Sequence, residues 1–218
     1  MISIIIPAYN EEKRIGKTLD NYKGFFKNSE IIVVCDGQDN TAEIAKSKKL
    51  KVLEFQRRLG KGLAIRKGLL VAQGSIIGFV DADGSVSAKE FKKLIDEING
   101  HDCAIASRRL KESKIEGDSA IRKFLRKSFN ILVNSLFFLG IKDTQCGGKV
   151  LKRTVLKSIL PELKTREFEF DIELLWNLKK NNFRIKEVPI VWTHTPATKM
   201  PINIPKMIIT LLRLRFNL

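Results

Sequence analysis

Two aspartates near the middle of the chain are the residues best suited to chemistry. Asp81 and Asp83 flank Ala82 directly after residues 75–80, an apolar run that predicts a buried strand. Carboxylate oxygens suit Mg²⁺ and Mn²⁺, and Mg²⁺ commonly joins one or two carboxylates to the phosphates of a substrate. The pair therefore predicts a divalent cation that holds a diphosphate, although the same spacing also occurs in solvated turns.

Three further polar segments could contribute to such a site. In residues 7–12, Pro7 is expected to end the first strand, and the loop offers backbone groups and an aromatic ring to a base or ribose. Asp36 begins a second segment directly after a buried strand, where its carboxylate could accept from a pyrimidine N–H. Both segments also read as ordinary helix caps. The third segment, residues 57–62, is basic and glycine-rich, so it could approach and neutralise a diphosphate. It has neither Walker nor Rossmann spacing, which disfavours a kinase-like NTPase and an NAD enzyme.

Cationic residues also recur in the middle of the chain. Arg108 and Arg109 follow a predicted strand and so fall at the same sheet edge as the two aspartates. Arg122 and Arg126 lie about one turn apart in a predicted helix, so they project from one face. A polar segment, residues 143–148, follows that helix.

Histidine and cysteine chemistry is not indicated. His101 and His194 are isolated in the sequence, so we expect both to be surface or structural residues. Cys35, Cys103 and Cys146 are odd in number and far apart, which suggests neither a zinc site nor a disulfide framework. The sequence suggests no Ser–His–Asp or Cys–His set.

The elements that must position these residues alternate in type through the first half of the chain. Apolar patterns predict strands at residues 2–6, 31–35, 52–55, 75–80 and 102–106, with helices at 13–26, from about 41, at 62–72 and at 88–98. This alternation predicts an α/β fold, a mostly parallel sheet with helices on both faces. Ligands of such sheets bind beyond the carboxyl ends of the strands, where the first two polar segments and the aspartate pair all fall.

The second half has a different pattern. It predicts a long helix at residues 121–139, a helix at 170–180 and an extended segment at 184–192. Residues 202–218 mix Ile, Leu and Met with lysine and arginine, so this tail could lie in a membrane interface or pack on the domain.

Size and charge limit the alternatives. The chain has 218 residues, enough for one α/β domain with a full core. Its formal charge of +16 favours a polyanionic partner, such as a nucleic acid, an anionic membrane face or a phosphorylated substrate. No run reaches the roughly 18 to 20 apolar residues that span a bilayer. The cysteine pattern fits a reducing, cytoplasmic setting. The first residues show no basic leader, so we expect a first strand there rather than a signal peptide.

Taken in order, these segments resemble the family 2 inverting glycosyltransferases of GT-A fold, and within them the dolichyl-phosphate sugar synthases. The resemblance is carried by residues 4–12, 32–41, 60–68, 80–84, 106–108, 143–149, 168–175 and 188–199. Residues 60–62, 81–84 and 143–147 are similar to the β-glucosyltransferase branch rather than to the mannosyl branch. The resemblance implies a GT-A-type nucleotide-sugar-binding domain over residues 1–200, and a basic amphipathic C-terminal helix over residues 201–218.

The resemblance also assigns roles to single residues. For the nucleotide sugar it implies Pro7, Ala8, Tyr9, Asn10, Glu11, Asp36, Gln38, Lys61, Asp81, Ala82 and Asp83. For Mg²⁺ or Mn²⁺ it implies Asp81, Asp83 and Ser85, the last of which stands where relatives often have glutamine. For the acceptor phosphate it implies Ser107, Arg108, Arg122, Arg126, Gln145 and Lys199. The expected catalytic residues are Asp83, Arg108 and Arg122.

The activity that the resemblance implies is transfer of a hexose from a nucleotide sugar, UDP-glucose in the favoured case, to a polyprenyl (dolichyl) phosphate. A lipid monophosphate is already anionic at neutral pH, so it can attack the anomeric carbon without a general base. The protein must then position this oxygen and stabilise the departing nucleoside diphosphate. The apolar helix and the basic tail are expected to dock on the inner, cytoplasmic face of a membrane. Phosphate-rich headgroups explain the positive charge better than a nucleic acid does.

Other hypotheses remain open at this point. The same fold could use GDP-mannose, or a glycan or lipid-linked oligosaccharide as acceptor. A non-catalytic nucleotide-sugar-binding or membrane-adaptor protein is a further alternative, against which the intact Asp81 and Asp83 argue. A nucleotidyltransferase would need a glycine-rich loop after the first strand, and residues 7–9 do not supply one.

Overall fold

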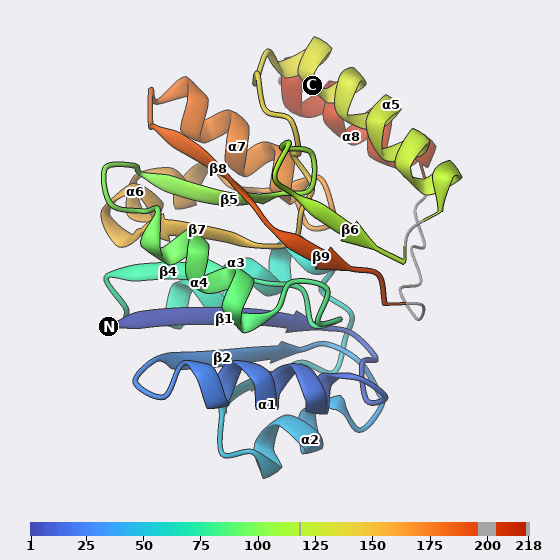
Figure 1. The fold of residues 1–218 in the computed structure, drawn as a ribbon. Helices are drawn as coiled ribbons and strands as arrows, with labels where there is room; N and C mark the ends of the chain where they lie inside the picture. The colour runs from blue at the N-terminus through green and yellow to red at the C-terminus, as the bar shows by residue number, and fades with distance from the viewer. Residues whose placement is uncertain (118, 196–203, 217–218) are drawn as a thin grey trace.

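The computed structural model describes residues 1–117, 119–195 and 204–216, which form an α/β fold around one large sheet (Figure 1). The strand order is β3 (Lys51–Glu54), β2 (Glu30–Cys35), β1 (Ile2–Ala8), β4 (Ile76–Phe79), β7 (Lys149–Lys152), β5 (Cys103–Ser107) and β8 (Ile185–Pro189). A separate two-stranded ribbon pairs β6 (Lys114–Glu116) with β9 (Val191–Thr193). The pairs β1–β2, β1–β4, β2–β3 and β5–β8 are parallel, which confirms the predicted fold class.

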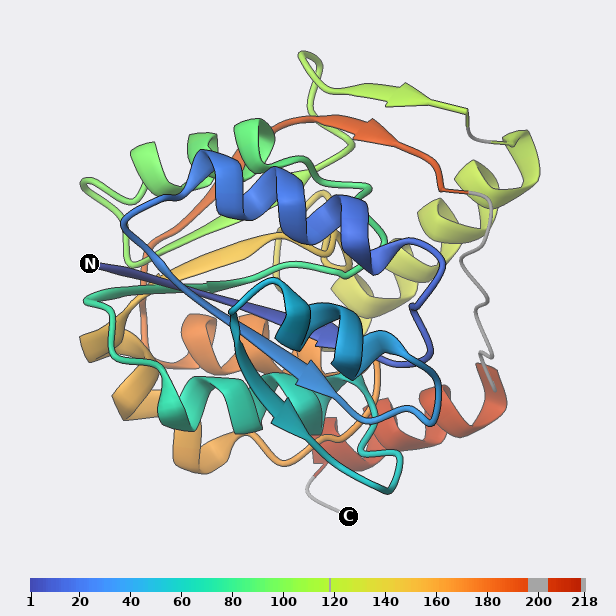
Figure 2. The same ribbon diagram turned by 90° about the horizontal axis from the view of Figure 1, so that it is seen from below.

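Helices cover both faces of the sheet, as predicted (Figure 2). One face carries α1 (Ile15–Phe25), α2 (Thr41–Ser47) and α4 (Ala88–Asp96), and the other carries α3 (Lys61–Val71), α6 (Arg153–Ile159) and α7 (Phe170–Lys180). A short 3₁₀ helix, Leu160–Glu162, follows α6. The apolar residues of α1 recur at helical spacing, and Ile15, Leu19 and Tyr22 are buried in the core of the first face. The two faces therefore hold two apolar clusters, one on each side of the strands.

Strand β7 lies in the middle of the sheet and was not predicted from the sequence. It runs antiparallel to both neighbours, with Val150 opposite Gly78 of β4 and opposite Ala104 of β5. Because β7 runs in the opposite direction, the segment that precedes it lies at the sheet edge where β4 and β5 end. Residues 143–148 therefore lie at the same sheet edge as Asp81 and Asp83.

The first strand is longer than expected. β1 continues to Ala8, and Pro7 pairs with Val34 of β2, so the expectation that Pro7 ends the strand is wrong. Proline lacks an N–H, but β4 pairs with β1 only as far as Ile5, so Pro7 has a neighbouring strand on one side only. The polar loop therefore begins at Tyr9.

Two helices lie side by side at one corner of the molecule, α5 (Ala120–Phe137) and α8 (Ile204–Phe216) (Figure 1). The Arg215 Nε–H of α8 donates to a carbonyl of α5 at 2.8 Å. Met207 and Leu211 of α8 are buried in the second apolar cluster, so this helix packs on the domain. Among the described helices, none combines the length and apolar character needed to cross a bilayer.

Candidate active site

The Asp81 side chain lies where the end of β4, the start of α3 and residues 143–148 meet. The Lys61 ammonium, at the first residue of α3, lies 2.8 Å from Asp81 Oδ1. Gly147 packs against the other carboxylate oxygen, and a Cβ built on this glycine would fall 2.1 Å from Asp81 Oδ2. The pocket around Asp81 therefore depends on the missing side chain at residue 147.

Asp83 and Ser85 lie on the turn that follows. The Ser85 N–H donates to Asp83 Oδ1 at 2.9 Å, and the Asp83 carbonyl accepts from Thr195 Oγ at 3.0 Å. The Ser85 hydroxyl is buried and has no hydrogen-bond partner in the part of the chain that is described. Segments more than a hundred residues apart thus hold the turn in place.

The donor set of this turn fits a hard divalent cation. The described residues contain no group of three or more His, Cys, Asp or Glu side chains that could hold a metal by themselves. Two carboxylates in one short turn, followed two residues later by the Ser85 hydroxyl, which has no partner among the described residues, supply oxygen atoms only. Mg²⁺ typically binds through one or two carboxylates and completes its coordination with water and substrate phosphates, so such a set suits it.

The Asp36 carboxylate is hydrogen-bonded to the basic loop, residues 57–62. Its Oδ2 accepts from the Leu59 and Gly60 N–H groups at 2.8 and 3.2 Å. Burial raises the pKa of Asp36, and these hydrogen bonds partly oppose that rise. Gly60 has a φ of +87°, a conformation that favours glycine, and so the loop folds tightly over Asp36. The predicted donor residues Asp36 and Lys61 are therefore joined by one loop.

The loop after β1 and the loop after β2 are cross-linked at the same edge. The Gln38 N–H donates to Asn10 Oδ1 at 3.0 Å, and Asn10 has a φ of +54°. Tyr9 is 46% exposed, and the Arg58 guanidinium lies over its ring at 5.0 Å from the centroid. Glu11 is held by Arg14, whose Nη2 lies 2.6 Å from Glu11 Oε1. An exposed ring beside a cation can stack on a planar base.

A cavity of about 250 Å³ lies beyond the end of β5, against α5. It is lined by Arg108, Arg109, Ile115, Lys123, Arg126, Lys127, Phe129, Asn130, Asp143, Thr144 and Gln145. The structure thus brings together three of the predicted acceptor residues, Arg108, Arg126 and Gln145, with two lysines and an arginine that the prediction did not include.

Arg108 is held firmly in this cavity by Asp143. Its Nε and Nη2 donate to the Asp143 carboxylate at 2.7 and 2.8 Å, and its backbone N–H donates at 2.9 Å. Burial alone would lower the pKa of Arg108, but Asp143 raises it above its ordinary value. Burial likewise opposes the charge on Asp143, yet Arg108 holds the pKa of this carboxyl below its ordinary value. Arg108 is therefore a fixed cation.

Trp192 of β9 is a functional candidate that sequence reasoning missed. The guanidinium groups of Arg108 and Arg126 lie 5.5 and 5.6 Å from the centroid of its ring. Burial and the nearby Arg108 lower the pKa of Arg126, as expected where cations gather. An anion bound between them would relieve this repulsion. The signal for Trp192 was weak, because a lone tryptophan in an extended segment more often belongs to a core.

Three predicted acceptor residues do not line this cavity. Ser107 is fully buried, and its hydroxyl has no partner among the described residues. Arg122 lies at the exposed start of α5, where its Nη1 lies 3.4 Å from His194 Nδ1. His194 is thus in contact with a predicted site residue. Lys199 lies outside the described residues.

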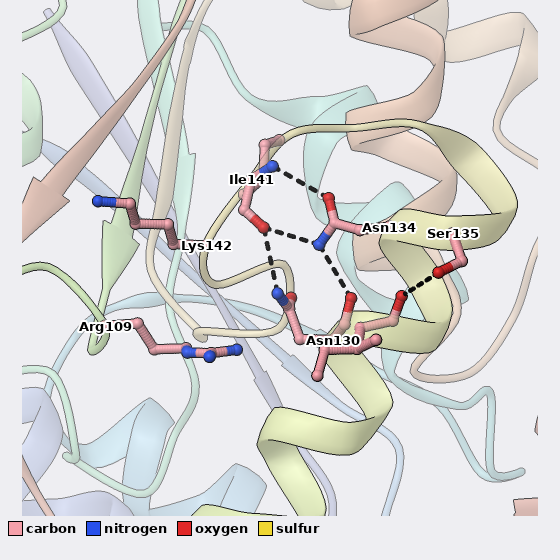
Figure 3. A pocket seen from close by; sticks show the side chains of 7 residues that line it. Arg109, Asn130, Asn134, Ser135, Ile141 and Lys142 are labelled. Atoms are coloured by element: carbon pink, nitrogen blue, oxygen red, sulfur yellow. Dashed lines mark hydrogen bonds between the residues drawn. The ribbon is translucent and has the colours of Figure 1, made fainter.

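A second, open cavity of about 590 Å³ lies farther along α5, where Asn130, Ile131, Asn134 and Ser135 line it (Figure 3). Figure 3 shows Asn130 and Asn134 pointing at the backbone of Ile141, whose carbonyl accepts from both amides at 3.1 and 2.9 Å. Arg109 and Lys142 lie on the opposite side of the view. Since Arg109 and Asn130 line both cavities, the two hollows adjoin.

Comparison with known proteins identifies the relatives of this chain. A family model described as "Glycosyl transferase family 2" matches residues 3–160. The chain is 32% identical over 223 residues to a protein from Dictyostelium discoideum named dolichyl-phosphate beta-glucosyltransferase, and the match covers 91% of this chain and 68% of that protein. The protein of the same name from Saccharomyces cerevisiae is 33% identical over 233 residues, covering 93% of this chain and 70% of the relative.

Solved structures share the fold at lower identity. Glucosyl-3-phosphoglycerate synthase from Mycobacterium tuberculosis, solved with Mn²⁺, UDP and glucosyl-3-phosphoglycerate, superposes with a TM-score of 0.76. Its sequence is 18% identical, and the match covers all of this chain and 80% of that chain. This likeness confirms the GT-A fold.

Proposed function

The chain belongs to glycosyltransferase family 2, and we propose that this glycosyltransferase moves glucose from UDP-glucose to a polyprenyl (dolichyl) phosphate. One observation carries the proposal: the carboxylates at the end of β4 and a cavity lined by five arginine and lysine side chains share one edge of the sheet. The names of the relatives support glucose as the sugar and dolichyl phosphate as the acceptor.

In this proposal the donor lies across the first half of the sheet edge. Tyr9, Asn10 and Gln38 receive the base and ribose, with the other predicted residues of their loops. The diphosphate lies towards Asp81 and Lys61. Lys61 supplies positive charge to the leaving nucleoside diphosphate, and such fixed charge at a leaving group stabilises the transition state.

A divalent cation, Mn²⁺ or Mg²⁺, would be held by Asp81 and Asp83, with Ser85 beside them. Bound there, it would neutralise charge that develops on the diphosphate. The oxygen donors of the turn support this assignment, as does the Mn²⁺ in the glucosyl-3-phosphoglycerate synthase structure.

The acceptor phosphate occupies the cationic cavity between β5 and α5. Arg108 and Arg126, whose guanidinium groups lie over the Trp192 ring, hold the phosphate, and Gln145 lines the same cavity. The phosphate oxygen attacks the anomeric carbon directly, because it is already anionic, and the protein contributes orientation rather than a base. A single displacement of this kind inverts the anomeric configuration. Arg122, at the exposed start of α5, meets the phosphate on its way into the cavity.

Lipid access follows from the surface of α5. Its exposed residues include Ile121, Phe124 and Leu125, and Lys123 and Lys127 lie beside them. Apolar side chains flanked by lysines suit the headgroup region of an anionic membrane. We therefore place the protein peripherally on the inner, cytoplasmic face of a membrane. Residues 1–200 form the catalytic domain in this proposal. The C-terminal helix after them adds to the membrane contact made by α5.

Two alternatives are distinguished by experiment. The same site could take GDP-mannose or a different acceptor, or the fold could bind nucleotide sugar without turnover. The decisive measurement incubates the purified protein with Mn²⁺ or Mg²⁺, a panel of labelled nucleotide sugars and a short polyprenyl phosphate. We expect a glucosylated lipid from UDP-glucose.

The matched control in this assay is Asp83→Asn, for which we expect turnover to be lost while the melting temperature stays near that of the parent protein. Lipid product from another donor alone would replace the glucose assignment. Absence of lipid-linked product from every donor would defeat the proposal as a whole.

A further inference from the structure

A chain of four charged side chains leads from the proposed donor site into the core. Asp171, near the start of α7, places Oδ2 3.1 Å from the Lys61 ammonium and Oδ1 2.5 Å from the Lys149 ammonium. Lys61 in turn lies 2.8 Å from Asp81. The order is Lys149, Asp171, Lys61 and Asp81, with alternating sign.

The exposure of the four side chains rises along this chain towards Asp81, and the Lys61 side chain is 12% exposed. The side chain of Lys149 is 0% exposed and that of Asp171 2%, whereas that of Asp81 is 36% exposed. A ligand entering from solvent would therefore meet Asp81 and Lys61, while Asp171 and Lys149 lie behind them.

Backbone packing between α3 and α7 places Lys61 close to Asp171. The Leu63 N–H donates to the Arg166 carbonyl at 3.1 Å, and a Cβ on Gly62 would lie 2.7 Å from Phe170 Cβ. The start of α3 thus packs directly on the start of α7. A cation at a helix N-terminus is unfavourable for that helix, so Lys61 is not there to stabilise α3. An acid at the start of α7 is favourable, which suits Asp171.

The two partners of Lys61 differ in what else they would bind. Asp81 is the carboxylate that a divalent cation would take in the proposed function. Were Asp81 the sole partner of Lys61, the ammonium and the cation would compete for it. Asp171 gives the ammonium a second carboxylate, so Lys61 does not depend on Asp81 alone. The other oxygen of Asp171 accepts from Lys149, which also donates to the Cys146 carbonyl beside Gly147.

We propose that Asp171, backed by Lys149, is a positioning residue that retains the Lys61 ammonium at the diphosphate end of the site when Asp81 binds its ligand. The inference rests on the proposed function only for the identity of that ligand, a nucleoside diphosphate. It concerns a second anchor for Lys61 within the full chain, and Asp171 itself does not touch the ligand.

The test measures how readily Lys61 reacts with acetic anhydride, by peptide mass spectrometry, with the exposed Lys89 as internal reference. In Asp81→Asn we expect Lys61 to react as slowly as in the parent protein, because Asp171 still holds it. In the double variant Asp171→Asn with Lys149→Met, adding Asp81→Asn should make Lys61 react at least about fivefold faster than in Asp81→Asn alone, because neither carboxylate then holds it. Fast labelling in Asp81→Asn, or slow labelling after Asp81→Asn is added to the double variant, would overturn the inference.

Binding of UDP with Mn²⁺, measured by calorimetry, supplies the functional readout. Asp171→Asn alone should melt well below the parent protein, because it leaves Lys149 buried without a counter-charge. The double variant should regain most of the melting temperature but bind UDP about tenfold more weakly. A double variant that regains both would show that the pair is merely structural and would overturn the inference.

Asp102→Asn is the matched control. It removes a lysine-paired carboxylate at the opposite end of β5, and both Lys61 labelling and UDP binding should stay unchanged. A parent protein that binds neither UDP nor GDP would count against the proposed function, while the labelling of Lys61 would still decide the role of Asp171.

Discussion

Gly147 shows how a single absent side chain shapes the candidate site. Its Cα approaches Asp81 so closely that any Cβ must displace the carboxylate. We expect Gly147→Ala to weaken binding of UDP with Mn²⁺ by about tenfold or more, a loss of about 1.4 kcal/mol or greater. Isothermal titration calorimetry measures it. Gly24→Ala is the control, because nothing lies within 4 Å of a Cβ at that position. Equal affinities in both variants would contradict this account of Asp81.

The Arg108–Asp143 pair should give the protein an acid-sensitive contribution to stability. The folded pKa of Asp143 lies below its ordinary value of 3.8, so the pair stabilises the fold fully above that value. The contribution is lost as the pH falls below 3.8 through the folded pKa. We therefore expect Asp143→Asn to lower the melting temperature at pH 7, by the equivalent of about 3 to 5 kcal/mol for a broken buried pair.

The difference in melting temperature between this variant and the parent protein should stay constant from pH 7 to about pH 4 and shrink as the pH is lowered further, to about 2. Circular dichroism across that range checks the prediction. Asp96→Asn, which removes an exposed partner of Lys92, should track the parent protein throughout. A constant difference for Asp143→Asn would show that the effect is steric rather than electrostatic.

Helix α5 carries the prediction that belongs to the scale of elements. Phe124 is 67% exposed and Leu125 55%, so replacing both with serine should leave the melting temperature almost unchanged. Full burial of each such side chain is worth about 1.5 to 3 kcal/mol, so partial insertion of both into lipid should account for at least about tenfold in vesicle affinity. We expect sedimentation with anionic vesicles to show that loss.

Leu70→Ser is the control for this experiment, since Leu70 is equally exposed but lies on α3. An equal loss in both variants would point to a general effect of surface hydrophobicity. Substitution is preferable to removal of α8, because Met207 and Leu211 of that helix are buried and truncation would open the core.

The elements of the first half were predictable because their signals are local. Apolar runs such as residues 31–35 mark strands without help from the rest of the chain, and polar residues directly after them mark the sheet edge. Strand β7 was missed because its first residue, Lys149, is a fully buried charge that only Asp171, on another element, makes tolerable. The convergence of Lys61, Asp171 and Asp81 depends on the same long-range packing, which no spacing in the sequence encodes.

At the scale of the whole molecule, the net charge of +16 makes a prediction about association. Screening shortens the reach of charge interactions, from about 10 Å at 0.1 M salt to about 3 Å at 1 M. We expect binding to anionic vesicles to weaken several-fold between about 50 and 500 mM NaCl, a range over which surface charges become largely screened. Vesicle sedimentation at several salt concentrations checks this.

Vesicles without anionic lipid are the control, and binding to them should be weaker and nearly independent of salt. Salt-independent binding to anionic vesicles would leave apolar contact as the sole attraction. In that case the positive charge would serve the phosphates of the substrates rather than the membrane.

The buried lysine at the start of β7 also has a consequence for how the chain finds its fold. A strand that slips by one residue turns every side chain to the opposite face of the sheet. For β7, such a slip would carry the Lys149 ammonium away from Asp171 and into the apolar cluster on the other side. A shifted register of β7 would bury an unpaired lysine and so be strongly destabilised. The same lysine that lies behind the donor site therefore selects the correct strand register during folding.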